Sequence, residues 1–178
     1  MKIRTTILAA LIASTFNLSA QAQYEDRILS MFWNLENFFD THDDGTSTSD
    51  SEFSSFGSRH WTRARFEKKR NMIAKTILWA AACCSDGQPP EVVGSAEVEN
   101  RKVVNSLIYC DVLAKCGYSC IHYDSPDRRG IDVALIYRTD SLELLHSESR
   151  TVRDSSGKVL PTRNMLLATF RNHRGQSF

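Results

Sequence analysis

The chain has 178 residues, of which 24% are charged, 42% hydrophobic and 10% aromatic. These values are typical of a single globular domain and exclude a disordered, collagen-like or polytopic membrane protein. The formal net charge is only +1. This excludes a polycationic nucleic-acid coat, because sequence-independent binding to phosphates needs many Lys and Arg side chains on one face. Any contact with nucleic acid must therefore be local.

The start of the chain has the composition of a secretory signal peptide. Lys2 and Arg4 provide a positive start, residues 7–18 are mostly apolar, and residues 20–22 (AQA) form a small-residue cleavage site. A membrane anchor would need about 18 to 20 apolar residues, so we expect cleavage and no stable membrane insertion. We therefore predict a signal peptide over residues 1–22 and an exported protein, periplasmic or extracellular, formed by residues 23–178.

Five cysteines follow this leader, namely Cys83, Cys84, Cys110, Cys116 and Cys120. Exported proteins meet oxidising conditions, so disulfides can form, but an odd number leaves at least one thiol free or paired between chains. A zinc site is disfavoured, because no second ligand pair stands at a familiar spacing from the cluster near residue 120.

The hydrophobic pattern of the first half predicts strand, helix, strand, helix. The first strand ends near Asn34, the first helix has Thr62 as its cap, and the second helix starts at Asn100 and stops at Gly117. The segment between the first strand and the first helix is rich in Asp, Ser, Thr and Gly, which indicates a solvated surface loop. In chain order the elements are a strand over 27–39, a loop over 40–58, a helix over 62–82, a strand over 91–96 and a helix over 100–116.

In the second half the hydrophobic period changes towards two, which indicates antiparallel strands. Strands over residues 118–123 and 131–137 flank a turn and form a hairpin. Shorter strands follow at 142–145, around Thr151, and at 165–170. We therefore predict an α/β (α+β) domain, with a mixed, mostly antiparallel sheet and helices on one face.

Asn34 and Glu97 are the first candidates for a functional site. Asn34 ends an apolar strand, where its amide can bind a phosphate oxygen or hold a metal-bound water, although a turn-forming Asn would look the same. Glu97 ends a buried strand, where open sheets place their ligands, and Mg²⁺ needs only one or two protein carboxylates. Alternatively, Glu97 and Glu99 bind no metal and only interact favourably with the dipole at the start of the next helix.

A third candidate segment is the hairpin turn with its two arginines. Arg128 and Arg129 can clamp a phosphate, since each guanidinium offers paired donors, or they are solvated turn residues paired with Asp124 and Asp127. Asp132 interrupts an otherwise apolar strand. A carboxylate there needs a partner, and we expect one of the two arginines to supply it.

Taken in this order, three segments resemble the endonuclease/exonuclease/phosphatase superfamily, the DNase I-like metal-dependent phosphoesterases. They are residues 32–40 (FWNLENFFD), 91–101 (EVVGSAEVENR) and 122–137 (HYDSPDRRGIDVALIY). The similarity covers nearly the whole chain after the leader, from about residue 28 to residue 170, and is closest to secreted bacterial members.

The resemblance implies one half of a four-layer sandwich and hydrolysis of phosphodiesters or phosphomonoesters. By analogy Glu97 matches the family's Mg²⁺-binding glutamate and Asn34 its active-site asparagine, and both are catalytic candidates. Arg128, Arg129 and Asp132 fall near the family's substrate groove and receive a supporting, substrate-binding role. Mn²⁺ suits the same oxygen ligands as Mg²⁺. The expected partner is a phosphate-ester substrate, with nucleic acid left open, and no protein partner can be inferred.

Two segments typical of the family are missing from the sequence. There is no Gly-Asp-x-Asn segment, which carries the water-activating base, and no late Asp-His pair; His173 directly follows a strand and is expected in a hairpin turn. Residues 23–178 therefore read as an incomplete, N-terminal portion of such a domain, inactive by itself. The alternative is a non-catalytic fragment or binding module that keeps part of the phosphate and metal cleft. The choice between nuclease and phosphatase stays open.

Overall fold

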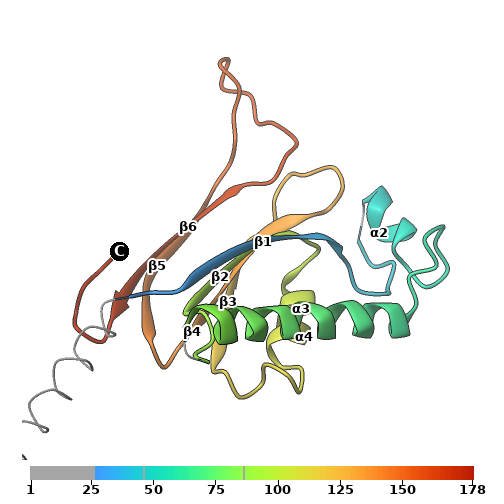
Figure 1. Ribbon diagram of the computed structural model, residues 1–178. Coiled ribbons are helices and arrows are strands. Elements are labelled where there is room, and N and C mark those ends of the chain that lie inside the picture. Colours follow the sequence, from blue (N-terminus) through green and yellow to red (C-terminus); the bar gives the residue numbers. More distant parts are fainter. Residues whose placement is uncertain (1–26, 46, 86) are drawn as a thin grey trace, which may run out of the picture.

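The computed structural model describes residues 27–45, 47–85 and 87–178. The predicted signal peptide, residues 1–22, lies outside this part. None of the helices in the described ranges has the length and apolar character needed to cross a bilayer. The elements of these ranges, labelled in Figure 1, are β1 (Ser30–Phe38), α2 (Thr48–Glu52), α3 (Arg63–Cys84), β2 (Val92–Val98), α4 (Arg101–Ile108), β3 (Tyr118–His122), β4 (Asp132–Arg138), β5 (Leu142–Arg150) and β6 (Met165–Asn172).

The strands form a mixed sheet and a separate hairpin. The sheet has the order β1-β2-β4-β3, and β5 pairs with β6. β1 and β2 are parallel, which requires a long crossover, and α3 supplies it. The pairs β2–β4, β3–β4 and β5–β6 are antiparallel. The predicted α/β class with a mostly antiparallel sheet is therefore confirmed.

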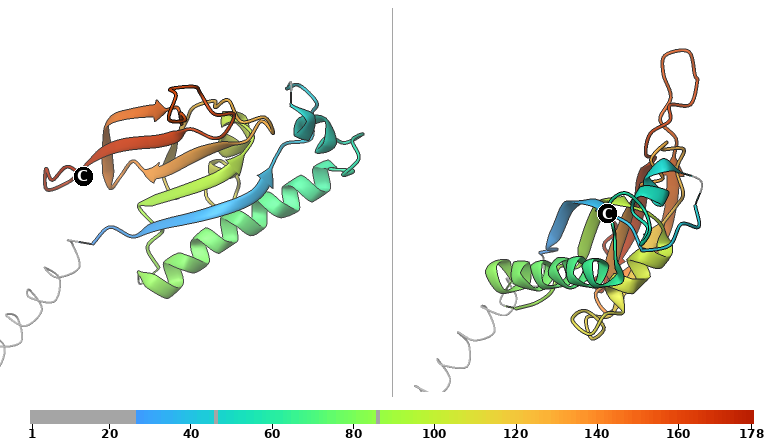
Figure 2. Two further views of the ribbon diagram at one scale, coloured as in Figure 1. Left: turned by 90° about the horizontal axis from the view of Figure 1, so that it is seen from above. Right: turned by 90° about the vertical axis from the view of Figure 1, so that its right-hand side faces the viewer.

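The sheet is covered by helices on one face and by the β5–β6 hairpin on the other (Figure 2). Alternate residues of β4 show this division, because Ile136 lies in the helix-side core and Leu135 packs in the hairpin-side core. The larger core gathers Phe38 of β1, Ile77 of α3 and Leu107 of α4. Most of the large, fully buried side chains in the described part of the chain lie in the helix-side core, so it is the main source of hydrophobic stability.

The two long helices begin where the sequence predicts. The Thr62 hydroxyl accepts from the Arg65 amide (3.4 Å), and the Asn100 side chain accepts from the Val103 amide (3.0 Å). The second helix, however, ends at Ile108 instead of continuing to Gly117. Residues 110–116 form hydrogen-bonded turns in which Leu113 stays fully buried. The apolar periodicity that predicted a longer helix therefore comes from turns that face the same core.

The predictions for the second half are mostly confirmed. The segments at 142–145 and around Thr151 belong largely to one strand, β5, which runs to Arg150. His173 lies in the turn after β6, where its ring contacts the Asp140 carbonyl. All five cysteines lie in the described part of the chain and none forms a disulfide.

The expectation of a solvated loop over residues 40–58 is wrong for its central part. This segment contains α2, and Asp50 and Ser54 are buried within it. Aromatic packing explains the burial, since Phe53 stacks on Phe39 with ring centroids 5.1 Å apart. The Trp61 ring meets Phe53 edge-on at 5.9 Å, and the three rings tie α2 to the end of β1.

We predict that Trp61→Phe lowers the free energy of unfolding by about 1–3 kcal/mol, because the indole Nε1 donates to the buried Phe39 carbonyl (2.9 Å) and Phe has no donor. The measurement is urea unfolding followed by far-UV circular dichroism. Trp79→Phe is the matched control, because Trp79 is 67% exposed on α3 and should be nearly neutral. Equal losses of stability in the two variants would show that the hydrogen bond from Trp61 to Phe39 is not the cause.

Candidate active site

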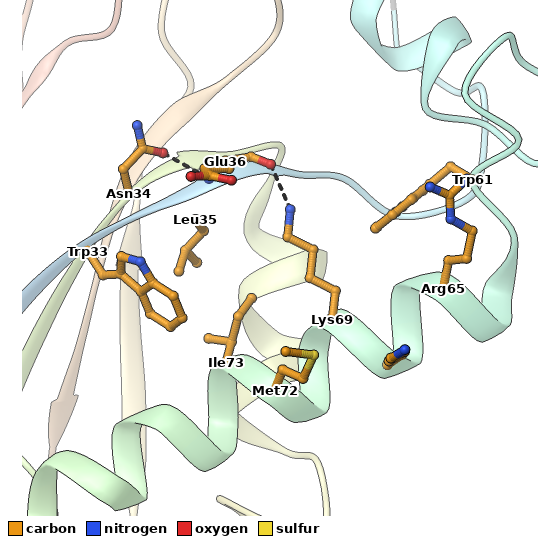
Figure 3. Close-up of a pocket in the computed structure, with 10 residues that line it drawn as sticks. Trp33, Asn34, Leu35, Glu36, Trp61, Arg65, Lys69, Met72 and Ile73 are labelled. Carbon is orange, nitrogen blue, oxygen red and sulfur yellow. Dashed lines mark hydrogen bonds between the residues drawn. The ribbon is translucent and has the colours of Figure 1, made fainter.

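Asn34 and Glu97 come together at the ends of the two parallel strands. Asn34 pairs with Ala96, the residue before Glu97, and beyond this pair the register of β1 with β2 becomes irregular. The Asn34 side-chain oxygen accepts from the Glu36 amide (2.8 Å). The rest of the Asn34 amide points away from the strand, on the side opposite Trp33 and Leu35 (Figure 3). The amide nitrogen of Asn34 can therefore donate to a ligand.

The backbone around this pair is strained. Glu36, Asn37 and Glu97 have φ angles of 54°, 61° and 63°, a region that residues with a Cβ seldom adopt. Each such residue costs about 1–3 kcal/mol and persists only where its surroundings hold it. The Glu97 carboxylate accepts from the Asn37 amide (3.2 Å), so the two distorted segments hold each other. A bulge of this kind re-aims side chains at sites.

Lys69 of α3 fixes the distorted end of β1. Its ammonium donates to the Glu36 carbonyl (2.6 Å), a contact drawn in Figure 3, and also to the Asn37 carbonyl (3.2 Å). Burial lowers the pKa of Lys69, while the nearby Glu36 and Glu97 carboxylates raise it in part. The sequence analysis missed this residue, because it lies in a basic helix run that resembles an ordinary solvated face.

Two arginines from different loops approach the Glu97 carboxylate. Arg163 lies 3.5 Å from Glu97 Oε1 and Arg129 lies 3.9 Å from the same oxygen. Arg129 is also held by the Asp127 carboxylate, 3.4 Å from its Nε. The alternative that Arg129 pairs with Asp127 is thus correct, yet the same side chain also faces Glu97. No sequence pattern around Arg163 indicated that it belongs to the site.

A cleft of about 470 Å³ lies on the helix side of Asn34 (Figure 3). One wall is apolar and the other is basic, so it can receive a ligand with a ring or chain and a negative charge. Glu97 does not line it. The residues on its walls include Trp33, Trp61 and Met72, and Arg65, Lys68 and Lys69.

The hairpin turn lies over a second, acidic hollow of about 560 Å³, lined by Arg128 and Asp132 among others. The turn is packed closely against α2. Gly130 has a φ of 67°, and a Cβ at this position would come within 2.6 Å of the Ser47 hydroxyl that caps α2. Gly130 is therefore required by both its backbone conformation and its neighbour. Arg128 is exposed at the rim of the hollow.

The expectation of an arginine partner for Asp132 is wrong. Asp132 is buried and pairs with the buried His122, with 3.0 Å between Oδ2 and Nε2. The other ring nitrogen faces the exposed Asp124 at 3.9 Å. The hairpin explains this contact, because His122 stands opposite Ala134 in β4, two residues beyond Asp132. The three side chains have donor atoms close enough to hold a metal.

The residues around Glu97 fit a hard divalent cation. Mg²⁺ takes one or two carboxylates and completes its shell with water and phosphate oxygens. Glu97 is largely shielded, with 13% of its side chain exposed, and both arginines stand at distances longer than a hydrogen bond. Glu97 would hold the cation, and the arginines and the Asn34 amide would surround a phosphate bound to it.

An acidic group lies behind this site, where β2 leads into α4. Glu99 accepts from the Asp40 amide (2.7 Å). The pKa of Glu99 is raised to about 8, chiefly by burial and also by the Asp40 and Asp50 carboxylates, whereas the hydrogen bond from the Asp40 amide lowers it in part. The sequence analysis treated Glu99 only as a helix-dipole residue.

Asp132→Ala should lower the free energy of unfolding by about 1–3 kcal/mol, because it leaves a buried His122 nitrogen without a partner. Urea unfolding followed by circular dichroism measures the loss. Asp124→Ala is the matched control, because this carboxylate faces the same ring but its side chain is 95% exposed. A loss for Asp124→Ala as large as that for Asp132→Ala would show that burial of the pair is not the cause.

Glu99→Gln should change how stability depends on pH. The folded pKa of about 8 lies above that of the unfolded chain, so the contribution of Glu99 is fully present below about pH 4.5 and is lost as the pH rises through 8. Without divalent cations the variant, which cannot ionise here, should exceed the wild type in stability at pH 8–9 and match it more closely near pH 5. Urea unfolding of both proteins in the presence of a chelator, measured from pH 5 to pH 9, tests this prediction. Identical pH profiles of stability for the wild type and the variant would contradict it.

Solved structures of other proteins have a similar fold. No curated protein matches the chain at a significant level. A Bacteroides thetaiotaomicron mannosyl-6-phosphatase is 14% identical with a TM-score of 0.53, covering 85% of this chain and 49% of its own. An endonuclease/exonuclease/phosphatase family protein of the same organism has the same identity and TM-score, covering 85% and 46%. The human Nocturnin catalytic domain with bound sulfate is 16% identical with a TM-score of 0.51, covering 85% and 46%.

At these identities the likeness shows the fold alone, and the chain spans about half the length of each structure. The sequence profile of the Endonuclease/Exonuclease/phosphatase family matches residues 30–176. This match includes both strands of the Asn34 and Glu97 site and the hairpin with its arginines. The chain belongs to the endonuclease/exonuclease/phosphatase family of phosphoesterases.

Proposed function

We propose that this chain forms the Mg²⁺- and phosphate-binding part of an exported phosphoesterase that hydrolyses phosphomonoesters or phosphodiesters. One observation carries the proposal. The parallel pairing of β1 with β2 puts Asn34 opposite Ala96, next to Glu97, and two arginines stand within 4 Å of the Glu97 carboxylate. A shielded carboxylate with cationic and amide donors around it suits a cation that is itself bound to a phosphate.

Each residue has a role in this proposal. Glu97 holds the cation, which neutralises charge on the phosphoryl oxygens when it is bound. Arg129 and Arg163 donate to the oxygens that the cation leaves free, and Asn34 orients one further oxygen or the attacking water. Arg128 attracts the substrate at the rim of the acidic hollow. Asp132 acts through His122, as a buried support of the hairpin that carries both adjacent arginines.

Two observations support a small phosphate ester as the substrate. The similar Bacteroides protein is a mannosyl-6-phosphatase, which acts on a phosphomonoester. The near-neutral charge of this chain favours a small phosphate ester over a long nucleic acid. Export rests on the leader at residues 1–22, and Mn²⁺ can replace Mg²⁺ at the same ligands.

We further propose that the chain does not turn over substrate by itself. Asn34 and Glu97 supply binding of the cation and phosphate, whereas in-line hydrolysis also needs a base for the water and a group that stabilises the leaving oxygen. The second candidate is a non-catalytic binding module, which keeps the Asn34 and Glu97 site and uses it for binding alone.

The test compares Mg²⁺ binding and turnover in the wild type and Glu97→Gln. Calorimetry should show weak Mg²⁺ binding by the wild type and binding at least about tenfold weaker in the variant, because one charged ligand is lost. p-Nitrophenyl phosphate and its bis ester should give no turnover above background. Glu148→Gln is the matched control, since Glu148 on β5 also pairs with an arginine, Arg150 (2.6 Å).

The outcomes separate the parts of the proposal. Unchanged Mg²⁺ affinity in Glu97→Gln would show that Glu97 is not the Mg²⁺ ligand. Robust Mg²⁺-dependent turnover by the wild type would contradict the proposal that the chain is inactive by itself. The coding DNA after the Phe178 codon distinguishes the two candidate functions. A frame that continues into a Gly-Asp-x-Asn segment and an Asp-His pair supports the phosphoesterase, and a stop codon supports the binding module.

A further inference from the structure

A second group of oxygen ligands lies apart from the Glu97 carboxylate. Asp44, Asp50 and Glu99 each offer one carboxylate oxygen, and these oxygens lie within 4.8 Å of one another. They come from the loop after β1, from α2, and from the junction of β2 with α4. Glu97 does not belong to this group, because its carboxylate contacts Asn37 and the two arginines.

Asp50 provides an independent indication of a ligand. It is only 3% exposed, and its Oδ2 accepts from the Gly45 amide (2.6 Å). Its Oδ1 is fully buried, and no donor in the described part of the chain reaches it. The carboxyl group lies against that of Glu99, which can share a proton with it when protonated, and one of its oxygens lies within 4.8 Å of an oxygen of Asp44 and of Glu99. A buried carboxylate oxygen without a donor is costly unless a cation contacts it.

The protein's own cations compensate this group only in part. Lys102 lies 3.0 Å from the Asp44 carboxylate, and Asp44 itself is half exposed. Glu99 accepts one backbone amide, and the neighbouring Asp40 contacts His42. The 560 Å³ hollow in front of the group is further lined by three aspartates against one arginine, namely Asp124, Asp127, Asp132 and Arg128. It therefore favours a cation and has room for its waters.

The chemistry of the group selects the kind of cation. The donors are all carboxylate oxygens, which bind hard divalent cations better than they bind soft metals. Ca²⁺ binds oxygens at about 2.3–2.6 Å, so two of its ligands can stand up to about 4.6–5.2 Å apart, which accommodates the observed spacing. Ca²⁺ also tolerates irregular ligand sets from loops, as here, whereas Mg²⁺ demands a nearly ideal octahedron.

We propose that Asp44, Asp50 and Glu99 form a structural Ca²⁺ site that fixes the α2 segment against the start of α4. Bound Ca²⁺ contacts the buried Asp50 oxygen, draws in Asp44 and releases Lys102 from it. The site stabilises the segment next to the arginine-bearing hairpin, which packs against Ser47 at the start of α2. The proposal of a Ca²⁺ site does not depend on the proposed phosphoesterase activity.

The experiment measures Ca²⁺ binding to the whole chain by calorimetry and by the shift of its thermal unfolding. The wild type should bind one Ca²⁺ at this site with a dissociation constant of about 10⁻⁴ M and unfold at a higher temperature with Ca²⁺ than with a chelator. Asp50→Asn should weaken binding at least tenfold and abolish the shift. Asp44→Asn serves the same purpose on an exposed side chain, so it tests the site even where Asp50→Asn fails to fold.

Two controls make the result specific. Asp43→Asn changes the exposed aspartate beside Asp44, which is not part of the group, and should leave the Ca²⁺ affinity unchanged. Glu97→Gln should keep the Ca²⁺ response while losing Mg²⁺ binding, which separates this site from the one in the proposed function. Lys102→Gln should tighten Ca²⁺ binding severalfold, because a competing cation is removed.

Two results would overturn the proposal. One is the absence of any Ca²⁺-dependent shift in the wild type up to about 10 mM, a concentration well above the usual range for extracellular sites. The other is a Ca²⁺ response that survives Asp44→Asn and Asp50→Asn undiminished. A proton shared between Asp50 and Glu99 would explain the first result, because it would satisfy the unpaired oxygen without a cation.

Discussion

The parallel pairing of β1 with β2 is the constraint on which the rest of the site depends. Regular pairing up to Asn34 and Ala96 aligns the strand ends, and the loss of register beyond them turns Glu97 into position. The strained angles at Glu36, Asn37 and Glu97 are the local cost of this turn. They are held by Lys69 from α3 and by the Glu97 carboxylate itself. The crossover helix therefore both connects the strands and fixes the distortion between them.

Charged side chains of reduced exposure gather where β1 and β2 end. The helix-side core is built from apolar side chains, whereas the ends of β1 and β2 carry carboxylates and arginines at reduced exposure. Solvent screens such groups weakly, so each depends on a specific partner or on a ligand. Asp132 has His122, Glu97 faces Arg129 and Arg163, and Asp50 has one amide and one free oxygen. This end of the sheet is suited to bind ions.

Sequence patterns predicted the features that depend on local physics. Thr62 and Asn100 are visible as caps because each precedes an apolar helical period, and the β3–β4 hairpin follows from its turn. The closeness of Asn34 and Glu97 followed from the family resemblance. Arg163 could not be found, because its contact depends on how a distant loop folds back. The burial of Asp50 was missed because its segment is polar, and the packing of Phe53 on Phe39 and Trp61, which ties this segment to the end of β1, depends on how the chain folds back.

The close contact of Gly130 with Ser47 has a mechanical consequence. Only 2.6 Å separate the Ser47 hydroxyl from where a Cβ at Gly130 would lie, so the tip of the hairpin packs directly against the start of α2. Any side chain at position 130 would push these two segments apart. Because Arg128 and Arg129 directly precede Gly130, such a displacement would move both arginines as well.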